Sequence, residues 1–203
     1  MGVGICGASG TGKTTLAKAV AKTANIKYVA SVTRSVYEEL GLSVQEDYDL
    51  KTRLMIQNAI LDKSEQQFIS SRGMFITDRT PIDFAAYVLA DVRRSNMSED
   101  EEEGVKLYLE RCIRSCNMHF QSIIVCQPGI QFVKEHGRTH GEMYNEHVNF
   151  LMIGIMSDQR IMTGKHILNR NVLDLKCRIT SVLKIMSITN KIEANQMGIL
   201  GTH

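Results

Sequence analysis

A glycine-rich run near the N-terminus constrains the fold of this chain more than any other feature. The run Gly7-Ala8-Ser9-Gly10-Thr11-Gly12-Lys13-Thr14 matches the pattern G-x-x-x-x-G-K-[ST] at every fixed position. An apolar segment, 1–6, precedes it and residues of helical character follow it, so the run is predicted to join a buried strand to a helix. A loop of this kind turns backbone N–H groups and a helix N-terminus towards bound phosphate. We therefore expect a nucleotide site here.

The residue types in this run predict a role for each part of it. Lys13 is expected to reach the β- and γ-phosphates and to act in catalysis, and the Thr14 hydroxyl is expected to bind Mg²⁺. The implied cofactors are ATP and Mg²⁺. The residues predicted to bind the nucleotide are Gly7, Ala8, Ser9, Gly10, Thr11, Gly12, Lys13, Thr14 and Thr15.

Predicted strands alternate with predicted helices along the 203 residues, which favours one α/β domain, 1–203, with a parallel sheet covered on both faces. Short apolar runs predict strands at 1–6, 27–32, 74–77, 122–126 and 165–168. Helices are predicted at 13–23, 48–70, from 81 onward, from a Ser98 cap to about 117, at 142–158 and at 172–186. Residues 188–203 show little pattern and are treated as a tail without predicted structure.

Composition and charge exclude several classes of protein. Hydrophobic residues make up 43% of the chain and charged residues 23%, values that argue against wholesale disorder. The formal net charge of +2 is too small to imply nucleic-acid binding by itself. No apolar run approaches the roughly 20 residues of a membrane span, and no leader pattern opens the chain. Five cysteines without disulfide-framework spacing suit a reducing compartment, so we expect a cytoplasmic protein with no membrane partner.

A second group of polar residues, Asp78-Arg79-Thr80-Pro81-Ile82-Asp83, follows the third predicted strand. An aspartate at the tip of a strand beside the phosphate loop can orient Mg²⁺ or deprotonate an acceptor hydroxyl. The adjacent Arg79 can bind the phosphoryl group as charge spreads over its oxygens. The alternative is a surface Asp–Arg ion pair, with Asp83 as a helix-start acid. Because a phosphate loop is present, we favour the catalytic interpretation for Asp78 and Arg79.

Two patterns of other phosphate-loop proteins are missing from the sequence. GTPases recognise guanine with an N-K-x-D segment after a strand, whereas the nearest string here, Asn190-Lys191-Ile192-Glu193, lies in the tail and ends in the other acid. Motor-type ATPases carry a second acid directly after the strand-ending aspartate, whereas Arg79 follows Asp78 in this chain. Since the phosphate loop alone does not define a function, these absences favour a kinase.

Three segments together resemble the ribosylnicotinamide-kinase-like branch of P-loop kinases: the glycine-rich run, Thr33-Arg34-Ser35-Val36-Tyr37-Glu38-Glu39-Leu40-Gly41, and 78–87. This branch includes viral and bacterial nucleoside or nucleotide kinases. A viral source, and with it a location in the host cytoplasm, is therefore a further expectation. The Asp78-Arg79 pair is similar to the strand-ending motif of thymidylate and deoxynucleoside kinases as well. The resemblance covers residues 1–158. It implies a P-loop kinase fold, with a central parallel five-stranded sheet flanked by helices and a lid segment at about 128–158.

The resemblance also implies an acceptor site and an arginine on the lid. Arg34, Asp78 and Asp83 are expected to contact the acceptor. Arg138, in the loop His136-Gly137-Arg138-Thr139-His140, is expected to act in catalysis by closing over the phosphates and excluding water.

The lid of this chain departs from the pattern of the family. The family often has an acid before the lid glycine and a second arginine further on, where this chain has His136 and then Asn145 and His147. A zinc site of His136, His140 and His147 is less favoured than solvated histidines, because no cysteine pair completes a tetrahedral set.

These features predict an ATP-dependent phosphotransferase that moves the γ-phosphate to a nucleoside or nucleoside monophosphate. One alternative is a polynucleotide kinase that phosphorylates a hydroxyl on DNA, for example on a modified base, because basic residues are frequent late in the chain. These basic residues are Lys165, Arg170, Lys176, Arg178, Lys184 and Lys191. The other alternative is a non-catalytic nucleotide-binding switch, which would leave Asp78 and Arg79 without a role.

Overall fold

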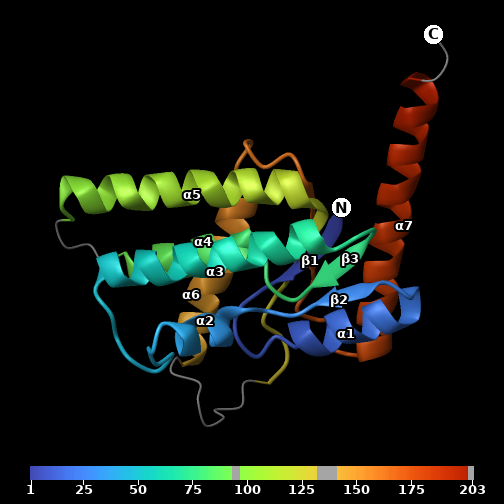
Figure 1. Cartoon of the computed structure of the whole chain (residues 1–203). Coiled ribbons are helices and arrows are strands. Elements are labelled where there is room, and N and C mark those ends of the chain that lie inside the picture. Colours follow the sequence, from blue (N-terminus) through green and yellow to red (C-terminus); the bar gives the residue numbers. More distant parts are fainter. Residues whose placement is uncertain (93–96, 132–140, 201–203) are drawn as a thin grey trace.

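Five parallel strands form one sheet in the middle of the molecule, in the order β2–β3–β1–β4–β5 (Figure 1). The strands are β1 (Gly2–Cys6), β2 (Lys27–Val29), β3 (Phe75–Thr77), β4 (Phe120–Cys126) and β5 (Gly164–Leu168). This computed structural model describes residues 1–92, 97–131 and 141–200. The predicted five-stranded parallel sheet is confirmed.

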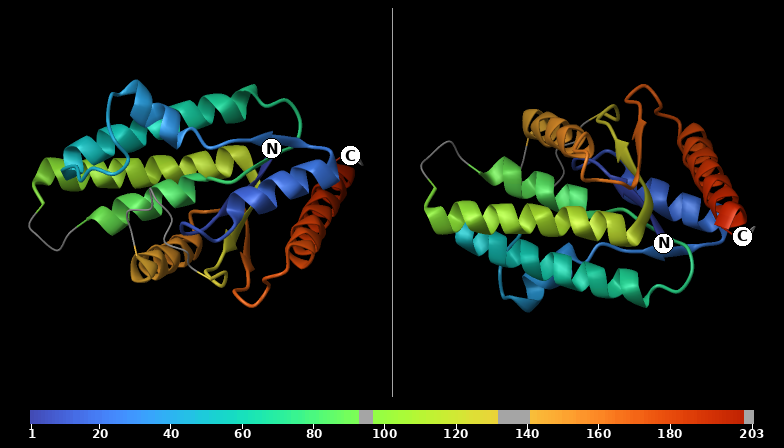
Figure 2. Two further views of the ribbon diagram at one scale, coloured as in Figure 1. Left: turned by 90° about the horizontal axis from the view of Figure 1, so that it is seen from below. Right: turned by 90° about the horizontal axis from the view of Figure 1, so that it is seen from above.

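Helices cover both faces of the sheet, as the prediction requires. The helices are α1 (Lys13–Ala24), α2 (Thr33–Glu39), α3 (Leu50–Ser70), α4 (Pro81–Asp91), α5 (Glu99–His119), α6 (Glu142–Met156) and α7 (Leu175–Leu200). Figure 2 shows α1 and α7 together on one side of the sheet, with α3, α4 and α5 on the other. A further apolar cluster joins α2 and α3 to α4 and α5, so these helices form an outer layer beyond the sheet.

The central strand β1 presents different residues to its two faces. Val3 and Ile5 point to the α1 and α7 side and pack in one buried cluster with Leu16 of α1. Gly4 points to the other side, where a Cβ would lie 2.5 Å from the Thr80 methyl group. The glycine therefore lets the start of α4 approach the strand closely.

The ends of the parallel strands bring the predicted polar residues together. Because β1 pairs with β3 on one side and with β4 on the other, the loop after Cys6 lies between the chain that follows Thr77 and the chain that follows Cys126. Ligands of open α/β sheets bind at the carboxyl ends of the strands, where the connections diverge. The functional site is therefore expected at this edge of the sheet.

Several predicted boundaries differ from those in the structure. The strand predicted at 27–32 ends at Val29, because its neighbour β3 ends at Thr77 and offers no further partner. The segment 33–39, quoted above only as a motif, forms the helix α2, which at 7 residues is too short to show a helical period. The helix predicted at 48–70 begins at Leu50, after an Asp49 cap that accepts a hydrogen bond from the Thr52 N–H at 2.7 Å.

The sequence pattern left residues 188–203 without predicted structure, and most of this segment is helical. The chain continues as α7 through to Leu200. Figure 1 shows that this end of α7 projects away from the sheet. The sequence of this segment shows no clear helical period of apolar residues, which is why no helix was predicted there.

Within residues 1–92, 97–131 and 141–200, none of the helices combines the length and the apolar character that crossing a bilayer requires.

Filling the Gly4 position is expected to destabilise the fold. Gly4→Ala places a methyl group against Thr80 and within 3.1 Å of the Phe120 ring, so the start of α4 must shift. We expect the free energy of unfolding in urea to fall by about 1–3 kcal/mol, the usual effect of overpacking a core. Gly154→Ala is the control, because Gly154 is exposed in α6 and nothing lies within 4 Å of its added methyl group. It should be neutral or slightly stabilising. Equal stabilities for the two variants would contradict the close approach of α4 and β1.

Candidate active site

The loop between β1 and α1 turns tightly, and three glycines make the turn. Gly7, Gly10 and Gly12 have φ values of 149°, 78° and 77°, which residues with a side chain rarely adopt. A Cβ on Gly7 would also lie 2.5 Å from the Cys126 carbonyl oxygen. The sequence pattern therefore has a steric basis in this structure, and the loop has the backbone that phosphate binding requires.

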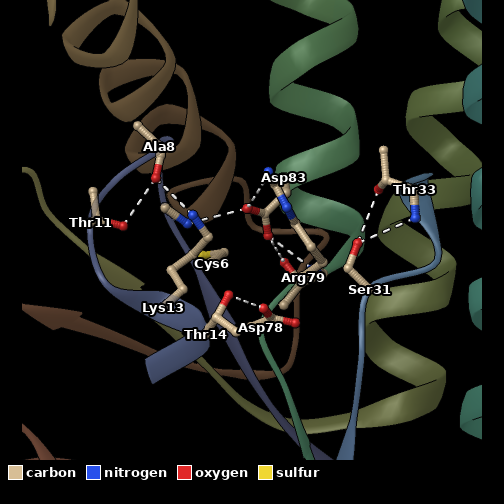
Figure 3. Close-up of polar contacts among 12 residues, drawn as sticks. Cys6, Ala8, Thr11, Lys13, Thr14, Ser31, Thr33, Asp78, Arg79 and Asp83 are labelled. Carbon is tan, nitrogen blue, oxygen red and sulfur yellow. Dashed lines mark hydrogen bonds and ion pairs between the residues drawn. The ribbon is translucent and has the colours of Figure 1, made fainter. Parts of the chain in front are cut away.

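Lys13 occupies the centre of the loop. Its Nζ donates a hydrogen bond to the Ala8 carbonyl oxygen at 2.7 Å, and the residue is 6% exposed (Figure 3). Burial and the nearby Arg79 charge lower the pKa of Lys13 to about 8, although the carboxylates of Asp83 and Asp78 oppose the shift. The ammonium group is thus held in a desolvated position, where a bound phosphate would stabilise its charge.

Asp78 and Thr14 meet across the β1–β3 pair. The Thr14 hydroxyl donates a short hydrogen bond to Asp78 Oδ2 (Figure 3). Asp78 is buried, and its Oδ1 has no hydrogen-bond partner among the described residues. Hydroxyl and carboxylate oxygens are the ligands that Mg²⁺ prefers, so the two residues fit the predicted metal role. Burial and the Asp78 charge also raise the pKa of the neighbouring Tyr28, whose hydroxyl stays protonated.

Asp83 is fully buried and joins three parts of the site. Oδ1 accepts from the Gly7 N–H at 3.3 Å and from Arg79 Nη1 at 3.3 Å, and Oδ2 accepts from the Thr80 N–H at 2.9 Å (Figure 3). Burial raises the pKa of Asp83, while Arg79 and Lys13 oppose the shift. The side chain has no exposed surface in this structure and holds these groups in position, and the expected contact with the acceptor stays a prediction.

The alternative interpretation expected a surface ion pair between Asp78 and Arg79, and the structure gives Arg79 a different partner. Arg79 pairs with Asp83, one turn along α4, and not with the adjacent Asp78. Thr80 and Asp83 do form the capping box of α4, so Asp83 is a helix-start acid as that interpretation held. Asp78 remains available to the phosphate loop.

A polar–aromatic cluster next to Arg79 was not predicted as part of the site. It consists of Tyr37, Arg53, Tyr87, Asp91 and Tyr144, from α2, α3, α4 and α6. The Arg79 guanidinium lies 5.2 Å from the centre of the Tyr87 ring, which in turn lies 6.5 Å from the ring of Tyr144. Arg53 Nε is 2.9 Å from Asp91 Oδ2, and its Nη1 donates to the Tyr37 hydroxyl at 3.0 Å. Tyr37 and Tyr87 fall within the quoted motifs, but nothing in the sequence indicated Arg53 or Asp91.

A polar cavity of about 620 Å³ adjoins the phosphate loop on the side of β4 and β5. Ser9, Gly10 and Thr11 form one wall, and the segment 128–131 and the chain after β5 form others. Asn145 of α6 donates to the Ser9 carbonyl oxygen at 3.2 Å and so holds this wall. The volume is in the range of small-molecule and cofactor sites.

The remaining predicted residues are less closely tied to the site. Thr15 is exposed in the first turn of α1, and Arg34 is exposed on α2. The predicted catalytic Arg138, with His136 and His140, lies outside the described residues. His147 is exposed on α6, and among the described residues no group of three or more histidine, cysteine or acidic side chains could hold a metal ion.

Three of the basic residues late in the chain are buried or engaged with other groups. Arg178 is buried, with 4% of its surface exposed. Arg170 Nη1 pairs with Glu146 at 3.0 Å, and Lys165 Nζ donates to the Asp158 carbonyl oxygen at 3.1 Å. Fewer of these cations are therefore free to contact the phosphates of DNA.

The chain is similar in structure to several kinases. A thymidylate kinase from Candida albicans superimposes with a TM-score of 0.70 and 15% identity, over 94% of this chain and 92% of that chain. A deoxyadenosine kinase from M. mycoides, with dCMP and dCDP bound, gives 0.67 and 17%, over 92% of this chain and 99% of that one. NadR in complex with NAD and AMP-PNP gives 0.66 and 17%, over 93% of this chain and 49% of that one. No curated protein sequence matches the chain.

The fold and the loop geometry define a phosphate-loop protein with the kinase fold. A family model described as an AAA domain, AAA_28, matches residues 3–161. The chain belongs to this AAA_28 family.

The lowered pKa of Lys13 predicts that nucleotide affinity depends on pH. Below pH 8 the free protein already carries the ammonium, and above it a proton must be taken up when phosphate binds. We expect the affinity for ATP to be constant up to about pH 7.5 and to fall about tenfold between pH 8 and 9.5. Titration calorimetry at fixed ionic strength measures this. Lys13→Arg keeps its charge throughout and should remove the fall, whereas a flat profile in the wild type would contradict the shift.

Proposed function

We propose that the protein is an ATP-dependent phosphotransferase that transfers the γ-phosphate to a nucleoside or nucleoside monophosphate. The observation that carries this proposal is the convergence of Lys13, Asp78 and Arg79 at one end of the sheet, beside a loop built to hold phosphate. The similar structures, a deoxyadenosine kinase and a thymidylate kinase, support the same class of reaction. Membership of the ribosylnicotinamide-kinase-like branch and a viral source remain predictions.

Each charged group has a step in this reaction. The loop N–H groups and Lys13 hold the β- and γ-phosphates in line with the acceptor. Asp78 removes the proton from the acceptor hydroxyl or, together with Thr14, would hold the metal, and Arg79 stabilises the charge that spreads over the transferred group. When bound at Thr14 and Asp78, Mg²⁺ neutralises charge on the phosphate oxygens.

The two substrates approach from opposite sides of the phosphate loop in this proposal. The polar cavity beside Ser9–Thr11 takes the nucleoside of the donor, because it adjoins the outer wall of the loop. The polar–aromatic cluster beside Arg79 faces the acceptor, since its tyrosine rings can stack on a base and its Arg53–Asp91 pair can bind polar groups. The contact of Arg34 with the acceptor remains a prediction. So does the closure of Arg138, on the lid, over the phosphates.

An acceptor screen tests the proposed reaction directly. The protein is incubated with γ-labelled ATP, magnesium and, separately, ribonucleosides, deoxynucleosides, their monophosphates, nicotinamide riboside and DNA. We expect label in a nucleoside or nucleoside monophosphate. Label in DNA alone would favour the polynucleotide kinase, and hydrolysis with no labelled acceptor would favour the nucleotide switch.

Asp78 and Arg79 distinguish a kinase from a nucleotide binder. Asp78→Asn should keep the shape and most of the ATP affinity but lower single-turnover transfer by about a hundredfold or more, the scale of a lost general base. Arg79→Lys should also lower it, because an ammonium cannot make the planar, paired contact of a guanidinium. Asp62→Asn is the control, because Asp62 is an exposed carboxylate paired with Arg111. If both variants transfer phosphate at the rate of the control, the roles proposed for Asp78 and Arg79 are wrong.

A further inference from the structure

Arg178 is a buried cation that lies against the outside of the phosphate loop. It is the fourth residue of α7, and only 4% of its surface is exposed. Its Nη2 donates a hydrogen bond to the Thr11 carbonyl oxygen at 2.8 Å. Its Nη1 lies 2.8 Å from the position that a Cβ on Gly12 would take. The guanidinium is therefore fitted to the turn formed by Thr11 and Gly12.

Among the described residues, the charge of Arg178 has no counter-charge within ion-pair distance. An arginine keeps its positive charge in proteins, and a buried charge is normally paired because burial removes its hydration. Yet no carboxylate lies within ion-pair distance of Arg178 in the part of the chain that the structure describes, and its Nε has no hydrogen-bond partner there. The nearby Cys126 does not supply a negative charge, since burial raises the pKa of its thiol more than Arg178 lowers it.

The hydrogen bond to Thr11 acts on the loop itself. The Thr11 carbonyl and the Gly12 N–H belong to one trans peptide group, so they point in opposite directions. A cation that donates to the oxygen polarises this group and makes its N–H a stronger donor. Gly12 is the N-cap of α1, where backbone N–H groups face a bound anion.

We propose that Arg178 is a positioning residue of the donor phosphate site, whose counter-charge is the polyphosphate of the bound nucleotide. It holds the Thr11–Gly12 peptide and adds positive potential from behind the loop. This inference rests on the proposed nucleotide binding and adds α7 to the machinery that performs it.

Binding of two ligands tests the role of Arg178. The probes are MgATP and inorganic tripolyphosphate, which lacks base and ribose, measured by titration calorimetry at several salt concentrations. Arg178→Gln should weaken both by about tenfold and make the affinity less dependent on salt. Arg178→Lys keeps the charge and should lose less than about threefold. Lys184→Gln removes an exposed charge from the same helix and should bind both probes like the wild type.

Each outcome decides for or against the inference. A residue that only braced the fold would lower the unfolding temperature and leave the salt dependence unchanged, which would overturn the proposal. So would an Arg178→Gln affinity within twofold of the wild type, or an Arg178→Lys variant as weak as Arg178→Gln. If Arg178→Gln does not fold, a tenfold loss in folded Arg178→Lys overturns the proposal and near-normal binding supports it. A wild-type protein that binds neither probe would refute the proposed function itself, which is a separate result.

Discussion

The buried carboxylate of Asp83 connects the parts of the site that the sequence places far apart. It accepts from the first N–H of the phosphate loop, from the side chain of Arg79 and from the cap of α4. A fully buried carboxylate is costly unless such partners surround it, so the three contacts and the charge stabilise one another. The loop, the strand-ending arginine and α4 therefore hold one fixed relative position before any ligand arrives.

Much of the framework could be predicted from local sequence signals. The glycine-rich run fixes a strand, a loop and a helix together, because only that backbone satisfies the pattern. The Ser98 capping box and Pro81 mark the starts of α5 and α4 at the residues where the structure has them. The five-stranded parallel sheet was expected from the resemblance to P-loop kinases, but the order of its strands was not predicted, since pairing between distant segments leaves no mark on local spacing.

The rest of the site depends on contacts that spacing does not encode. Asp83 is a helix-start acid in the sequence, and only the approach of α4 to β1 brings it to the Gly7 N–H. Arg178 belonged to a series of late basic residues that suggested a surface, and its burial reverses that interpretation. The Arg53–Asp91 pair joins α3 to α4 and has no local signal at all. In each case the role follows from tertiary packing.

The glycine at position 4 sets how the reacting groups are spaced. With no side chain on β1 at this position, the Thr80 methyl group and the Phe120 ring occupy the space beside the strand, so the start of α4 lies close to it. Lys13 begins α1, which packs against one face of this strand, and Arg79 directly precedes the cap of α4, which lies against the other. A methyl group added at position 4 would therefore displace the segment that carries Arg79, although no charged residue has been changed.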